Sequence, residues 1–222
     1  MGYPHMKSRI SALRVTAGLL GITTGLYGVE HSYFEALQGN VAPSAVLINA
    51  VSPPCLPYPL GCEPAMTFLP SYLLTGILAM SISLVVIVWS TFFVQRRNGG
   101  VILILLSILQ VLLGGGLAPI FGGIFGGIAG TKIDSPSTWW RAHLGIGNAG
   151  LLAKLWPWSL AIYLLWVPAE LVLGYVFGAS NPILASLPSF PIPVVFLLLA
   201  VLGGISYDIR GFPLHGKDNP SN

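Results

Sequence analysis

Charged side chains are scarce in this sequence. Its 222 residues include 10 Lys and Arg and 7 Asp and Glu, which is 8% of the chain, whereas soluble domains carry about 25%. Hydrophobic residues make up 54%, more than one soluble core hides, because part of every fold faces water. This composition excludes an ordinary soluble domain and predicts an all-α integral membrane protein.

Several function motifs are also missing. The sequence contains no GxxxxGK[ST] phosphate loop, no HExxH zinc motif and no GxSxG nucleophile elbow. Its basic residues form no stripe with interleaved aromatics, so the net charge of +3 does not indicate nucleic-acid binding. Of the four histidines only His31 lies at membrane depth, which disfavours haem ligation. We expect no cofactor and no nucleic-acid partner, and we favour a protein that is not an enzyme.

Apolar runs of the length that crosses a bilayer predict a transmembrane helix bundle, since a membrane helix needs about 20 residues. Four full spans are expected, at 11–29, 72–94, 155–177 and 191–207. The first is a retained anchor rather than a cleaved signal peptide, because no small-residue cleavage site follows it. We expect one integral membrane domain covering residues 1–222.

The stretch 100–130 decides the topology, because Gly114-Gly115-Gly116 and Pro119 interrupt it. As one long crossing it gives five spans. As a Gly-rich hairpin it places all ten Lys and Arg residues on one side with the N-terminus, as the positive-inside bias prefers. Each arm has roughly 14 residues, or about 20 Å, so the hairpin is short enough to be re-entrant. We favour the hairpin, with both termini cytoplasmic.

The outer connection, residues 38–70, is long and rich in proline, so it is neither a helix nor a central strand. It contains Cys55 and Cys62, the only cysteines. On the oxidising side of a membrane they are candidates for a disulfide, with two unpaired thiols as the alternative. Two soft ligands without a nearby histidine are a weak zinc signal, so the sequence predicts no metal site.

Glycine spacing predicts how the helices pack. Gly18, Gly21, Gly25 and Gly28 share one face of the first helix, and residues 122–130 of the hairpin repeat the pattern. Small residues let membrane helices approach closely. The favoured interpretation is packing within the chain, and a homo-oligomer interface is the alternative.

Ionisable residues at membrane depth are functional candidates by default. Glu30 lies 16 positions after Arg14, and Glu170 lies 16 positions after Lys154. Each spacing is about 24 Å of helix, so the hairpin topology puts both carboxylates at one level, with Gln110 slightly deeper.

These three residues, together with His31 and Tyr27, form a candidate intramembrane polar site that relays protons, binds a cation or orients a headgroup. The alternatives are that Glu30, His31 and Glu35 are merely the wet outer end of the helix, and that Glu170 is a neutral, hydrogen-bonded structural acid.

Some local patterns resemble a family of prokaryotic polytopic membrane proteins without a known activity. They are Gly-Leu-Tyr-Gly-Val-Glu-His at 25–31, Tyr-Asp-Ile at 207–209 and, between 114 and 158, Gly-Gly-Gly-Leu-Ala-Pro, Ile-Ala-Gly-Thr-Lys-Ile, Thr-Trp-Trp-Arg-Ala-His-Leu and Leu-Ala-Lys-Leu-Trp-Pro-Trp. The resemblance implies one unit in the plasma membrane of a prokaryote. It implies no activity and no site residues.

Three function hypotheses follow, given in order of preference. The first is a non-catalytic component or accessory subunit of a membrane assembly, whose partners are the lipid bilayer and other membrane subunits or copies of itself. The second is a small proton- or cation-coupled transporter using Glu30, His31 and Glu170. The third is a membrane enzyme acting on lipid.

Overall fold

The computed structural model describes residues 11–51, 63–133, 140, 146–177 and 191–211. Within these residues the chain forms six helices and a two-stranded sheet. The helices are α1 (Ala12–Leu37), α2 (Tyr72–Phe92), α3 (Gly99–Leu112), α4 (Pro119–Thr131), α6 (Ile146–Phe177) and α8 (Pro191–Gly211). The strands are β1 (Leu47–Asn49) and β2 (Pro64–Met66), which pair antiparallel.

The predicted all-α class is confirmed. In the described part of the chain, α1, α2, α6 and α8 are long and apolar enough to cross a membrane, as in a multi-pass membrane protein, whereas α3 and α4 are shorter. Helix α1 extends eight residues past its expected end, and α6 begins nine residues before its expected start. The outer connection, expected to be neither a helix nor a central strand, contributes the short strands β1 and β2.

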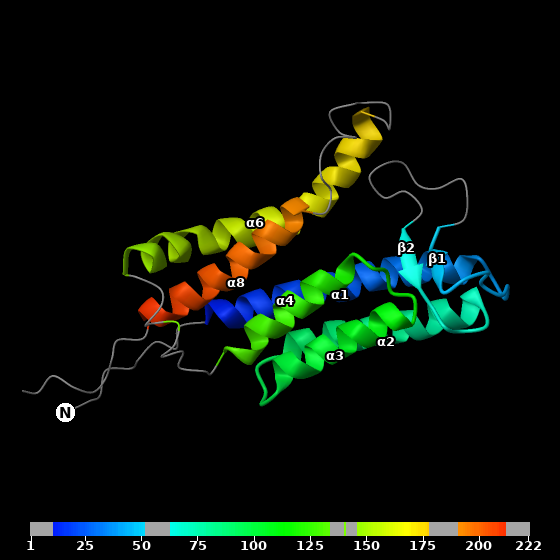
Figure 1. Ribbon diagram of the computed structural model, residues 1–222, viewed down its shortest axis with the longest axis horizontal. Helices are drawn as coiled ribbons and strands as arrows, with labels where there is room; N and C mark the ends of the chain where they lie inside the picture. Colours follow the sequence, from blue (N-terminus) through cyan, green and yellow to red (C-terminus); the bar gives the residue numbers. More distant parts are fainter. Residues whose placement is uncertain (1–10, 52–62, 134–139, 141–145, 178–190, 212–222) are drawn as a thin grey trace, which may run out of the picture.

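Successive helices run in alternating directions, so their ends gather at two ends of the molecule (Figure 1). These two ends differ in the charged residues that they carry. The start of α1 and the end of α8 lie at one end, and the sheet and the turn 113–118 between α3 and α4 lie at the other. The described basic residues belong to the segments at or near the first end: Arg14 near the start of α1, Arg96 and Arg97 between α2 and α3, Lys132 after α4, Lys154 in the first third of α6 and Arg210 near the end of α8. We call this the basic end, and the end with the sheet the acidic end.

A carboxylate joins the first and last helices at the basic end. Asp208 of α8 accepts hydrogen bonds from the backbone N–H groups of Ala12 and Leu13, at 2.7 and 3.1 Å, and from the Ser11 hydroxyl at 2.6 Å. The first N–H groups of a helix have no partner within the helix, and its N-terminus carries partial positive charge. Asp208 therefore stabilises the start of α1.

Helix α1 packs against α2, α4 and α8, and the predicted glycine faces lie in these internal contacts. Cβ atoms added at Gly21 and Gly25 would collide with Ser90 and with Ile87 of α2. At Gly28 a Cβ would collide with Gln110 of α3 and Ser83 of α2. These glycines therefore bring helices of one chain into close contact.

Gly28→Ala is expected to destabilise the protein by about 1–3 kcal/mol, because the new methyl group overpacks a buried contact. Gly18→Ala is the matched control on the same helix, since its Cβ would meet only a backbone oxygen at 3.5 Å. The control is expected to be neutral or slightly stabilising, because alanine favours helix. Thermal unfolding of the two variants in detergent checks this, and equal melting temperatures would contradict it.

Candidate functional site

The acidic end contains a cluster of ionisable groups that begins with the last turns of α1. Because α1 continues to Leu37, Glu30, His31 and Glu35 lie within the helix. His31 is 7% exposed and Glu35 is fully buried. Burial contradicts the wet-end interpretation for these two residues, whereas the side chain of Glu30 is partly exposed, at 36%.

Glu63, just before β2, joins this cluster, although the sequence analysis did not single it out. Its Oε2 lies 3.5 Å from Nε2 of His31, and Oε2 of Glu30 lies 3.1 Å from Nδ1 of the same ring. The imidazole therefore lies between two carboxylates that are 33 residues apart in the sequence. No local pattern marks Glu63, because its partners come from another segment.

Burial controls the ionisation of Glu63, whose residue is only 4% exposed. Desolvation raises the pKa of its carboxyl from 4.5 to about 7, with His31 opposing the rise and Glu30 adding to it. Its backbone adopts a left-handed conformation, with φ of 49°, which is uncommon for a residue with a side chain. Burial therefore favours the protonated, neutral form of the Glu63 carboxyl.

The glycine turn 114–116 covers the cluster from the α3–α4 side. Gly114 and Gly116 have φ of 106° and 83°, which glycine adopts at little cost. A Cβ at Gly116 would collide with the His31 ring, and one at Gly114 would collide with the Glu35 carboxylate. Only glycine lets this turn lie directly against both side chains.

Glu35 occupies the position one helical turn beyond His31, on the same face of α1. Both of its carboxylate oxygens are buried, and neither has a hydrogen-bond partner among the described residues. Thr75 of α2 also borders this site: its methyl group lies next to Gly114, and its hydroxyl is 2.9 Å from that of Thr67. An unpartnered carboxyl in such a place is costly unless it binds a proton or a cation.

Two further residues of the predicted site, Tyr27 and Gln110, also lie near this cluster. Tyr27 contributes its backbone carbonyl, which is 2.9 Å from Nδ1 of His31. Gln110 is fully buried and donates from Nε2 to the Thr24 carbonyl at 3.0 Å and to the Gly115 carbonyl at 3.5 Å. Gln110 thus holds the glycine turn against α1 rather than contacting His31.

The remaining predictions fall outside the described residues. Cys55 and Cys62 lie in the segment 52–62, so the disulfide stays a prediction. The backbone of Glu170 belongs to α6, but its side chain is not described, so its membership of the site stays a prediction as well.

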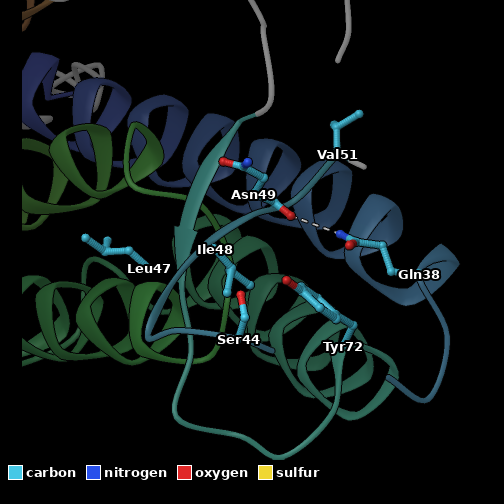
Figure 2. A pocket seen from close by; sticks show the side chains of 7 residues that line it. All are labelled: Gln38, Ser44, Leu47, Ile48, Asn49, Val51 and Tyr72. Carbon is cyan, nitrogen blue, oxygen red and sulfur yellow. Dashed lines mark hydrogen bonds between the residues drawn. The ribbon is translucent and has the colours of Figure 1, made fainter. Parts of the chain in front are cut away.

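A separate open pocket lies beside β1 at the acidic end (Figure 2). It is lined by Gln38, Ser44, Leu47, Ile48, Asn49, Val51 and Tyr72. Gln38 donates from Nε2 to the carbonyls of Asn49 and Ala50, at 2.9 and 2.7 Å, and so ties β1 to the end of α1. The lining has no carboxylate and no imidazole, so it offers a cation none of the groups that the acidic cluster has.

Comparison of the chain with protein-family models, with curated proteins and with solved structures found no match. The site is therefore interpreted from its own geometry. An imidazole between two carboxylates, with a third buried carboxyl one turn away, is suited to holding a proton or a cation.

The pKa of Glu63 is expected to be visible by infrared spectroscopy as a protonated-carboxyl band that disappears with a midpoint near pH 7. Because the folded-state pKa lies above the ordinary value, the folded protein binds this proton more tightly, and its contribution to stability is lost as pH rises from about 4.5 to about 7. Glu63→Gln is expected to remove the band and flatten that dependence. An unchanged band in this variant would contradict the assignment.

Proposed function

We propose that this chain is a small cation-coupled membrane carrier that takes up protons or another cation at its acidic end. One observation carries the proposal: Glu30, His31, Glu35 and Glu63 come together at that end, and three of them are buried. The chain has only seven acidic residues, and three of them lie in this one cluster. Ionisable groups at membrane depth typically mark proton or ion pathways.

The orientation is part of the proposal. Basic residues favour the cytoplasmic side of a membrane, so we place the basic end, with both termini, in the cytoplasm and the acidic end outside. In this arrangement α3 and α4 form a hairpin that enters from the cytoplasm and turns at 113–118 without a full-length span. The cation then enters from the outer side, past the partly exposed Glu30.

Cysteine labelling tests this orientation. In a chain with Cys55 and Cys62 replaced by serine, Lys132→Cys is expected to react with a membrane-impermeant maleimide only after the cells are permeabilised. Ser44→Cys, at the acidic end, is the matched control and is expected to react in intact cells. Labelling of Lys132→Cys in intact cells would instead favour one long crossing through 100–130.

Proteoliposomes test the transport step. With an imposed membrane potential and a pH-sensitive dye inside, the protein is expected to move protons faster than empty vesicles do. Glu35→Gln and Glu63→Gln are each expected to lower the rate at least about tenfold, because each removes a buried proton-binding group. Asp208→Asn, which neutralises a carboxylate at the basic end, is the matched control. A parent rate equal to that of empty vesicles, both for protons and for Co²⁺ as the transported cation, would contradict the proposal.

An accessory subunit of a membrane assembly is the second candidate. It is supported by the apolar face that α2 exposes, which includes Leu73, Leu74, Ile77, Leu78, Leu84, Val85, Val88 and Phe92. Lipid covers such a face as well as a partner helix does, so this support is weaker than that of the acidic cluster. A subunit with no transport of its own leaves the proton flux at the level of empty vesicles, and the same experiment separates the two candidates.

A further inference from the structure

Glu30, His31 and Glu63 each place one oxygen or nitrogen ligand atom within 4.8 Å of the other two. We propose that these three side chains bind a divalent transition-metal ion such as Zn²⁺ or Co²⁺. This inference rests on the proposed cation uptake, because it names the class of cation that the site takes. It also revises the expectation, drawn from the sequence, that the chain has no metal site.

The spacing of the ligand atoms fits such an ion. Zn²⁺ binds nitrogen and oxygen ligands at about 2.0–2.2 Å in a tetrahedral arrangement, so two of its ligands lie about 3.4 Å apart. The distance between Nε2 of His31 and Oε2 of Glu63 is 3.5 Å. These two atoms can therefore coordinate one ion. Glu30, whose Oε2 lies 3.1 Å from Nδ1, would complete the set by turning its partly exposed side chain.

The orientation of the imidazole also fits. Nδ1 lies 2.9 Å from the Tyr27 carbonyl, which can only accept a hydrogen bond, so the tautomer that makes this bond has its hydrogen on Nδ1 and its Nε2 lone pair towards Glu63. Metal-binding histidines almost always donate their second N–H to a carbonyl or a carboxylate, which fixes the ring. Gly116 lies against the ring, so a side chain at this position would collide with it.

An independent observation concerns Glu63. Its residue is 4% exposed, and neither carboxylate oxygen has a hydrogen-bond partner among the described residues. A buried carboxylate needs a cation, a donor or its own proton. A metal ion shared with His31 supplies the missing partner.

The ligand set points to a class of ion. Ca²⁺ and Mg²⁺ favour sites made of oxygen atoms alone, whereas an imidazole suits Zn²⁺ and its neighbours among the transition metals. Three protein ligands leave at least one position open, as in sites that exchange a ligand, whereas structural zinc sites are closed by four. Because the Glu30 side chain is 36% exposed, the ion can enter and leave at this position.

Cobalt binding tests the inference. The full chain is purified in detergent through a tag without histidine, stripped with a chelator and titrated with Co²⁺, which reports its coordination by visible absorption. We expect one Co²⁺ per chain, displaced by Zn²⁺. His31→Asn and Glu63→Gln are each expected to weaken binding at least tenfold, since loss of even an outer-shell partner costs about 10–100-fold.

Two further variants keep the test decisive. Glu30→Gln changes a partly exposed side chain and is expected to fold even if a buried substitution does not, and it too is expected to weaken binding. Asp208→Asn is the matched carboxylate control at the basic end and is expected to bind Co²⁺ as the parent does.

A parent chain without a single Co²⁺ site, or variants that bind as the parent does, would overturn the metal inference. If proton flux is present in that case, the proposed function stands with protons as its cation. If flux is absent too, both proposals fail.

Discussion

The reversal of the chain between α3 and α4 is the constraint on which the acidic end depends. The backbone N–H groups of a turn that packs inside a protein need hydrogen-bond partners within the protein. The turn meets this requirement. The N–H groups of Gly114 and Gly115 donate to carbonyls of the last turn of α3, and Leu117 donates to the Pro64 carbonyl of β2 at 3.1 Å. The turn is thus held between a helix end and a strand.

Because the turn consists of glycines, its backbone can lie directly against the side chains of the cluster. The collisions that a Cβ at Gly114 or Gly116 would cause, with Glu35 and with His31, show how closely the glycine backbone covers these two groups. The Pro64 bond that anchors the turn also brings the neighbouring Glu63 over the same helix face. The hairpin, the sheet and α1 therefore all contribute to one cluster, and the partly exposed Glu30 lies at its surface.

The fold was largely predictable, and the candidate site only in part. Apolar runs located the four long helices because lipid demands long apolar segments, and the pair His31 and Glu30 was found because charge is rare in such segments. Gln110 was a sound choice as a buried polar residue, but it stabilises the turn rather than the cluster. Glu63 and the cap by Asp208 were missed, because neither residue's partners lie near it in the sequence.

The sequence by itself determined the class, the long apolar helices and the glycine faces, because composition and periodicity are local properties that reflect the solvent around each segment. Tertiary structure alone decided which polar groups meet. Glu63 reaches His31 only because β2 lies along the turn 113–118 and that turn lies against α1. Such contacts depend on how three distant segments pack together, and no spacing within any one of them encodes that arrangement.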